Sequence, residues 1–228
     1  KEQCERHLQA GAKKVLISAP ASGEDRTVVY GVNHKDLRSE DKIVSNGSCT
    51  TNCLAPPTKV LDDHFSIVSG LVTTVHAYTN DQSVLDVPHS DLRRARAAAQ
   101  NMIPTSTGAA KAIGLVLPHL KGKIDGLAIR VPTPNVSVVD ATYLVKKAVN
   151  LENVQEVLKT ACESTLKGVM NYTFEPLVSS DFNGSSFSSV LDMTMTKVSQ
   201  GTLVKILSWY DNEMGFSHRM LDVARLMA

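Results

Sequence analysis

The sequence contains no run of apolar residues close to the roughly 18 that a membrane-spanning helix needs. Its charge is nearly balanced, with 24 Lys and Arg against 23 Asp and Glu and a formal net charge of +1. Such a balance gives no electrostatic argument for nucleic acid or a membrane surface as a partner. Cys49 and Cys53 are four residues apart, but no second Cys or His pair stands at zinc-ligand spacing. We therefore expect no membrane, no nucleic-acid partner and no metal.

Glycine-rich turns and disulfide patterns are missing as well. The turn G-x-G-x-x-G, which cradles the pyrophosphate of a dinucleotide, does not occur, and Gly11, Gly23 and Gly31 are scattered. The four cysteines suit a reducing compartment better than a disulfide framework, so a cytoplasmic location is expected. With 43% hydrophobic and 21% charged residues, the composition is that of an ordinary globular protein.

The spacing of apolar residues predicts a mixture of strands and helices. The predicted strands span residues 14–18, 43–44, 67–76, 127–131, 137–145 and 202–210. The predicted helices span residues 2–11, 107–117, 151–165 and 215–227, and another begins after residue 48, where two prolines at 56 and 57 are expected to disturb it. Long strands beside helices indicate an α+β domain with a mixed, largely antiparallel sheet, flanked by α/β segments.

Cys49 lies in a segment of small hydroxyl and amide residues, SNGSCTTNC, at residues 45–53. Residues 46–48 are typical of a turn and offer Ser or Asn as a helix N-cap, so Cys49 is predicted in the first helical turn. Free backbone N–H groups and the helix dipole favour an anion there, and the thiolate is the reactive form of cysteine. The alternative is that Cys49 packs as a small buried hydrophobe.

His76 ends a predicted strand beside small polar residues. If it reaches Cys49, it can take the thiol proton and later donate to an oxyanion, and a cationic histidine there would lower the pKa of the thiol. The alternative is a structural histidine without chemistry.

Two further positions suit an anion. Thr107 and Gly108 open a predicted helix, whose N–H groups favour phosphate, and Arg130 ends a strand. Arg94 lies in a long basic loop at residues 81–100, and long loops without regular structure are often functional. The alternative is that Arg93, Arg94 and Arg96 form a solvated basic loop or pair with acidic groups across a subunit interface.

Six sequence blocks connect these residues. In order, they are SCTTNC at 48–53, TTVHAYTNDQ at 73–82, DLRRAR at 91–96, PTSTGAAK at 104–111, RVPTPNVS at 130–137 and WYDNE at 209–213. They resemble the signature segments of the glyceraldehyde-3-phosphate dehydrogenase family, and the resemblance covers essentially the whole chain.

This resemblance implies a phosphorylating enzyme of glycolysis that works as a homotetramer. In the family, a cysteine attacks the aldehyde of glyceraldehyde 3-phosphate, a hydride passes to NAD, and inorganic phosphate releases the thioester as 1,3-bisphosphoglycerate. Val87-Pro88 resembles the pair found in NAD-preferring members, so NAD is the expected cofactor.

The resemblance also implies a role for each matching residue. Cys49 is the nucleophile, His76 is its acid–base partner, and Asn212 holds the nicotinamide carboxamide. The substrate phosphate and inorganic phosphate are contacted by Ser48, Thr50, Thr79, Arg94, Thr107, Gly108 and Arg130. No role is implied for Arg93 and Arg96.

Members of the family begin with a strand and a glycine-rich turn, so the resemblance implies that roughly their first third lies outside this sequence. Residues 1–48 would be the C-terminal part of the NAD-binding Rossmann domain, 49–211 the catalytic domain, and 212–228 a helix returning to the first domain. We expect the 228-residue chain to be inactive alone. Two alternatives are erythrose-4-phosphate dehydrogenase and a non-catalytic fragment that serves as an interaction module.

Overall fold

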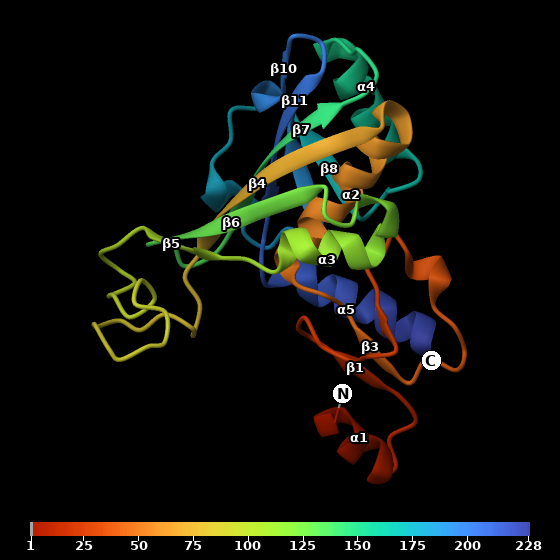
Figure 1. Ribbon diagram of the computed structural model, residues 1–228, viewed down its shortest axis with the longest axis vertical. Coiled ribbons are helices and arrows are strands. Elements are labelled where there is room, and N and C mark those ends of the chain that lie inside the picture. Colours follow the sequence, from red (N-terminus) through yellow and green to blue (C-terminus); the bar gives the residue numbers. More distant parts are fainter. Residues whose placement is uncertain (1) are drawn as a thin grey trace.

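Most strands of the chain join one large sheet, which dominates the computed structural model of residues 2–228 (Figure 1). Its strands are β4 (Ile67–Ala77), β5 (Ile103–Ser106), β6 (Ile124–Val131), β7 (Ser137–Val145), β8 (Met170–Thr173), β9 (Ser189–Asp192), β10 (Lys197–Ser199) and β11 (Leu203–Tyr210). They run in the order β5-β6-β4-β7-β11-β9-β8, with β10 paired to β11. Only the pairs β4–β6 and β8–β9 are parallel. The predicted mixed, largely antiparallel sheet is confirmed.

A second, small sheet lies at the other end of the molecule, near α1 (Glu2–Gln9) in Figure 1. It contains β1 (Val15–Ile17), β2 (Arg26–Thr27) and β3 (Ile43–Ser45), all parallel, in the order β1-β3-β2. The C-terminal helix α5 (Met214–Met227) packs on it, with Val223 and Met227 buried against Val28 and Val44. Residues before 48 and after 212 therefore pack together. The domain boundaries themselves stay a prediction.

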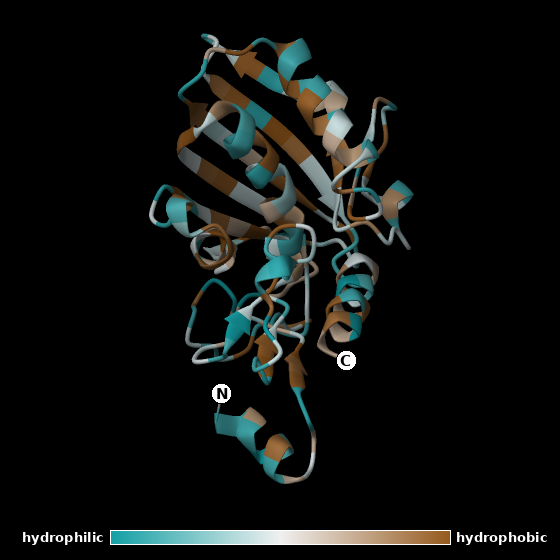
Figure 2. Cartoon of the chain, turned by 90° about the vertical axis from the view of Figure 1, so that its right-hand side faces the viewer, coloured by the Kyte–Doolittle hydropathy of each residue, from teal (hydrophilic) through white to brown (hydrophobic). Residues whose placement is uncertain are grey.

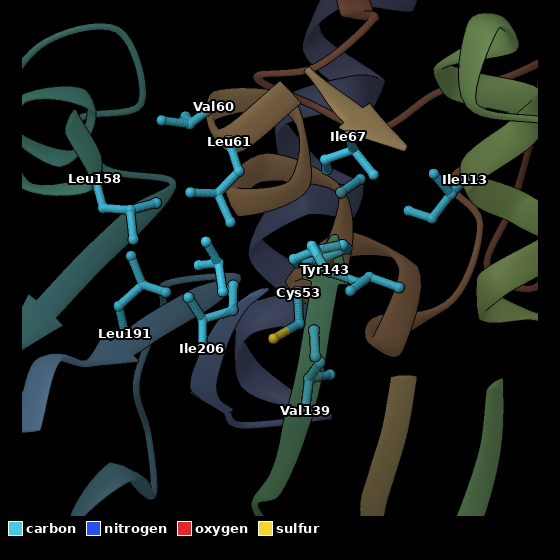
Figure 3. Close-up of a cluster of buried hydrophobic side chains, with 14 of the residues drawn as sticks. Cys53, Val60, Leu61, Ile67, Ile113, Val139, Tyr143, Leu158, Leu191 and Ile206 are labelled. Atoms are coloured by element: carbon cyan, nitrogen blue, oxygen red, sulfur yellow. The ribbon is translucent and has the colours of Figure 1, made fainter. Parts of the chain in front are cut away.

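Three helices contact the large sheet and form the main core with it: α2 (Cys49–Phe65), α3 (Ala109–Val116) and α4 (Leu151–Glu163). Figure 2 shows them in front of one face of the sheet. The core residues drawn in Figure 3 include Leu61 of α2, Ile113 of α3 and Leu158 of α4, which face Tyr143 and Ile206 of the sheet. Helix α2 thus lies between α3 and α4 on this face of the sheet.

Both prolines lie inside α2, which runs on through Pro56 and Pro57 to Phe65. The predicted helix after residue 48 is confirmed, and the two prolines do not end it. A proline removes one helical hydrogen bond, but every residue from Thr50 to Thr58 is buried. Burial of this apolar surface offsets the lost bonds, because most helical stability in proteins comes from tertiary packing.

The opposite face of the large sheet stays uncovered within residues 2–228. Alternate side chains of a strand point to opposite faces, and on this face Leu71, Leu127 and Leu144 are 71%, 44% and 40% exposed. They lie on the adjacent strands β4, β6 and β7.

None of the helices within residues 2–228 combines the length and the apolar character that a membrane span requires.

Candidate active site

Cys49 is the first residue of α2, as predicted. The chain leaves β3 at Ser45, and Ser48 then caps the helix: its Oγ accepts a hydrogen bond from the backbone N–H of Thr51 at 3.0 Å. Asn52 fixes the same turn, because its Nδ2 donates to the carbonyl oxygens of Asn46 at 2.8 Å and Ser48 at 2.9 Å. Cys49 therefore lies among the free N–H groups at the start of a rigidly held helix.

His76 reaches Cys49 from β4. The distance from Cys49 Sγ to His76 Nε2 is 3.5 Å, and His76 is buried with 4% of its surface exposed. On the other side of the ring, Nδ1 lies 2.7 Å from the carbonyl oxygen of Ala77 and 2.7 Å from Nη1 of Arg130. The edge of the Tyr210 ring also faces the imidazole, with ring centroids 6.0 Å apart. The predicted pairing of cysteine and histidine is present.

The protonation of this pair differs from the expectation of a cationic histidine. Burial, helped by the nearby Arg130, lowers the pKa of His76 to about 4, so its imidazole is neutral at neutral pH. Burial raises the pKa of the Cys49 thiol, while hydrogen bonds from Thr50 and the charge of Arg130 act in the opposite direction. Burial and Arg130 thus disfavour the expected imidazolium beside Cys49, and the positive charge that acts on the thiol is that of Arg130.

A cavity of about 210 Å³ opens over Cys49. It is lined by Pro20, Ser48, Cys49, Thr50, Thr74, His76, Arg94, Ser106, Thr107, Gly108, Ala109, Ala128 and Arg130. Eight of the ten predicted site residues are among them. Thr79 and Asn212 are not.

The wall opposite Cys49 is suited to anions. Thr107 and Gly108 precede α3, and Thr107 Oγ1 accepts a hydrogen bond from the Ala109 N–H at 3.2 Å. Arg130 donates through Nη1 to the carbonyl oxygen of Ala77 at 3.0 Å, while its buried Nε has no hydrogen-bond partner among the described residues. Two guanidinium groups, Arg94 and Arg130, therefore line one small cavity together with the start of a helix.

The basic loop residues fall into different environments. Arg94 donates through Nη1 to Asp81 Oδ2 and through Nε to Thr105 Oγ1, both at 2.7 Å. It therefore lines the cavity and also pairs with an acidic group of its own chain, whereas the alternative interpretation placed such pairs across a subunit interface. Arg96 pairs with Asp86 at 3.1 Å, and Arg93 is exposed. These contacts set the direction of the Arg94 guanidinium.

Comparison with known proteins decides the family. Residues 48–212 match the family model described as "Glyceraldehyde 3-phosphate dehydrogenase, C-terminal domain". The chain belongs to the glyceraldehyde-3-phosphate dehydrogenase family. It is 58% identical to the glyceraldehyde-3-phosphate dehydrogenase of Geobacillus stearothermophilus and 59% identical to those of Cereibacter sphaeroides and Zymomonas mobilis. Each comparison covers the whole of this chain and 68% of the relative.

Two residues that the glyceraldehyde-3-phosphate dehydrogenase resemblance assigns to the site lie outside the cavity. Thr79 lines a neighbouring cavity with Tyr78 and Gln82, and its N–H donates to Gln82 Oε1 at 3.0 Å. Asn212 follows β11, and its Oδ1 accepts a hydrogen bond from Ser137 Oγ at 2.9 Å. Their assigned roles stay predictions.

The cavity over Cys49 is also lined by residues that the sequence analysis did not single out. Thr74 precedes His76 by two residues on β4, so strand alternation places both on one face and could have identified it. Ser106 adjoins Thr107 at the end of β5, but that strand was not predicted. Pro20 follows β1 and comes from the small sheet, which no local pattern connects with Cys49.

The hydroxyl groups of Ser48 and Thr50 already have partners. Ser48 Oγ lies 2.8 Å from Thr51 Oγ1, and Thr50 Oγ1 lies 2.8 Å from the buried Tyr210 hydroxyl. Tyr210 also contacts Thr74 Oγ1 at 2.9 Å.

Among residues 2–228, no group of three or more His, Cys, Asp or Glu side chains is arranged to hold a metal ion.

Proposed function

We propose that this chain forms the catalytic part of a phosphorylating glyceraldehyde-3-phosphate dehydrogenase that uses NAD. The observation that carries this proposal is the position of Cys49 at the start of α2, 3.5 Å from His76 Nε2, in a cavity lined by two guanidinium groups. A nucleophile, its base and an anion-binding wall are the parts that this reaction requires.

The covalent step begins with proton transfer. The neutral imidazole of His76 accepts the thiol proton of Cys49 at Nε2, and the thiolate attacks the aldehyde carbon. The helix start and the charge of Arg130 stabilise the thiolate. His76, now protonated, donates its proton to the oxygen of the adduct and takes it back when the carbonyl group of the thioester forms. The chemistry that NAD supplies when bound is acceptance of the hydride that leaves this adduct.

The anion-binding residues would place the two phosphates. Arg130, Arg94 and the start of α3 line the Cys49 cavity, and Ser48 and Thr50 lie beside the nucleophile. Phosphate oxygens bind well to guanidinium groups and to helix N-termini. Thr79 borders the neighbouring cavity and would complete the set from the loop that follows β4. Inorganic phosphate held here can attack the thioester on Cys49 and release an acyl phosphate.

The described residues fit the nicotinamide end of NAD but not its pyrophosphate. In parallel α/β sheets, ligands bind at the carboxyl ends of the strands, and here Pro20 after β1 and Ser48 after β3 both line the Cys49 cavity. Asn212 offers a carboxamide for the nicotinamide. By contrast, residues 2–228 contain no glycine-rich turn between a strand and a helix to cradle the pyrophosphate. We propose residues 1–48 as the C-terminal part of the NAD-binding domain.

Two further features support the remaining proposals. The exposed leucines on the free face of the large sheet, Leu71, Leu127 and Leu144, favour burial against a second copy, in keeping with a homotetramer. The four cysteines are free, which suits the cytoplasm as the compartment.

Residues 1–228 alone should neither bind NAD at micromolar concentration nor oxidise glyceraldehyde 3-phosphate, because the described residues, 2–228, offer no cradle for the pyrophosphate. The full-length protein should do both. The measurements are calorimetric titration with NAD and the rise of NADH absorbance with glyceraldehyde 3-phosphate and inorganic phosphate.

Three other outcomes have separate meanings. Turnover by residues 1–228 would contradict the expected inactivity of this segment. Faster turnover of erythrose 4-phosphate by the full-length protein would favour the related dehydrogenase. A full-length protein that binds NAD tightly but oxidises neither aldehyde would contradict the proposed function.

Replacing Arg130 by glutamine should weaken phosphate recognition in the full-length protein about tenfold to a hundredfold, because a charge-assisted contact is lost. The pH midpoint of Cys49 alkylation should also rise, since Arg130 is the cation that lowers the pKa of this thiol. The KM values for glyceraldehyde 3-phosphate and for inorganic phosphate measure the first effect, and the rate of Cys49 alkylation as a function of pH measures the second. Arg93→Gln is the matched control, because Arg93 is exposed. Equal effects of the two substitutions would remove Arg130 from the site.

A further inference from the structure

Ser137 connects Asn212 with the strand that carries His76. Its Oγ accepts a hydrogen bond from the Ala77 N–H at 3.0 Å and donates to Asn212 Oδ1 at 2.9 Å. Ser137 is the first residue of β7, and only 2% of its surface is exposed. The buried Ser137 hydroxyl therefore bridges Ala77, the neighbour of His76, and Asn212, the residue expected to contact the cofactor.

The donor and acceptor roles in this chain of bonds follow from the groups available. The Ala77 N–H can only donate, so Ser137 Oγ is its acceptor. The hydroxyl hydrogen of Ser137 then needs an acceptor of its own, because a buried polar hydrogen without a partner is costly. Asn212 Oδ1 is that acceptor, whereas the reversed carboxamide would present two hydrogens and leave the hydroxyl unsatisfied. The amide orientation of Asn212 is thus determined by Ser137.

The backbone of Asn212 is fixed independently, by its neighbour Asp211. The Oδ1 atom of Asp211 accepts from the N–H groups of Glu213 and Met214, each at 2.9 Å. Its Oδ2 atom accepts from the N–H of Gly184 at 2.8 Å and from Nδ2 of Asn135 at 2.9 Å. These bonds hold the turn between β11 and α5, and they also keep the pKa of Asp211 below its ordinary value. Asp211 places the main chain, and Ser137 is left to set the side chain.

We propose that Ser137 is a positioning residue for cofactor recognition: its hydroxyl holds Asn212 Oδ1 and leaves Nδ2, the donor end, for a carbonyl oxygen of the ligand. The ligand group is therefore an amide carbonyl, such as that of nicotinamide, and not an amide N–H. This inference rests on the proposed function, because it assumes that Asn212 contacts NAD.

A double-mutant cycle on the full-length protein tests the inference with Ser137→Ala, Asn212→Ala and the double variant. Ser137→Ala should weaken NAD binding roughly threefold to tenfold, the scale of one lost hydrogen bond. The double variant should bind NAD as weakly as Asn212→Ala alone, because Ser137 acts through Asn212. NAD affinity is measured by calorimetric titration without substrate, and KM for NAD and kcat are measured separately.

The controls separate positioning from general loss of structure. Ser137→Thr keeps the hydroxyl and should restore NAD affinity. Ser189→Ala removes another buried strand hydroxyl, which lies 2.6 Å from Ser208 Oγ, and should leave KM for NAD unchanged. The rate of Cys49 alkylation should be the same in Ser137→Ala as in the wild type, because the Cys49–His76 contact is intact.

The positioning role is overturned if the effects of Ser137→Ala and Asn212→Ala on NAD affinity add up in the double variant. It is also overturned if Ser189→Ala raises KM for NAD as much as Ser137→Ala does. In both cases the wild-type protein still oxidises glyceraldehyde 3-phosphate. In that case the proposed function stands. If the wild-type full-length protein does not bind NAD, the proposed function and the inference both fail.

Discussion

Replacing Cys49 by serine in the full-length protein should reduce dehydrogenase turnover on the order of 10⁶-fold, the scale of losing a catalytic nucleophile. An alcohol is a far weaker nucleophile than a thiolate at neutral pH, and burial makes His76 a weak base for activating it. The fold should persist, because the substitution exchanges one atom at the half-buried first position of α2. NADH formation and thermal unfolding together measure the two expectations.

Iodoacetamide provides the matching chemical test. Cys53 and Cys162 are buried, and burial raises the pKa of each thiol to about 12, so neither should react readily at neutral pH. Cys4 lies half-buried on α1 and is best replaced by serine so that it does not compete. Mass mapping should then find Cys49 labelled first. If Cys162 is labelled before Cys49, the assignment of the nucleophile is wrong.

Replacing His76 by asparagine should slow acylation by about 10²–10⁴, the usual contribution of a positioned acid or base. The cause is the loss of Nε2, which lies 3.5 Å from Cys49 Sγ and receives the thiol proton. The amplitude and rate of the first NADH burst in rapid mixing measure this step directly. A burst as fast as that of the wild type would separate His76 from the chemistry.

The pH dependence of alkylation tests the protonation of the pair in the same variant. Because the pKa of His76 is about 4, its imidazole stays neutral as the pH rises above neutrality, and the alkylation rate follows the ionisation of Cys49 alone. Burial raises the pKa of the Cys49 thiol above its ordinary value, so the alkylation rate should increase into the alkaline region. The midpoint of this increase should be the same in His76→Asn. A wild-type inflection near the ordinary histidine pKa of about 6.5, absent from the variant, would indicate a cationic His76.

The long elements could be predicted from the sequence because their patterns are local. Strands β4, β7 and β11 alternate between buried and less buried residues, and α4 repeats its buried positions Val154, Leu158 and Ala161 at helical spacing. The cap of α4 was also predictable, since Asn150 accepts a hydrogen bond from the N–H of Asn153 at 2.8 Å. Strands β2, β5, β8, β9 and β10 were missed because two to four residues are too short to show a period.

The candidate site was predictable where motif and helix start coincide, at Cys49 and at Thr107. Two features were not. The neutral state of His76 depends on its burial and on Arg130, which is 54 residues away in the sequence and adjacent in space. The bridge from Ala77 through Ser137 to Asn212 depends on a meeting of β4, β7 and the end of β11 that only the sheet register creates. Pairwise contacts between distant strands leave no local pattern to read.

The position of α2 in the core gives the site two halves with different local stability. Beyond its first turn, the amide hydrogens of α2 lie in a stretch, Thr50 to Thr58, whose residues are all buried, so their exchange with solvent requires an opening close to global unfolding. Arg94 lies in the segment between β4 and β5, which projects from the sheet in Figure 1 and exposes Val84, Leu85 and Leu92. Segments with few buried contacts open at much lower free energy. The segment that carries Arg94 can therefore open locally, while Cys49 on α2 and Arg130 on β6 keep their places.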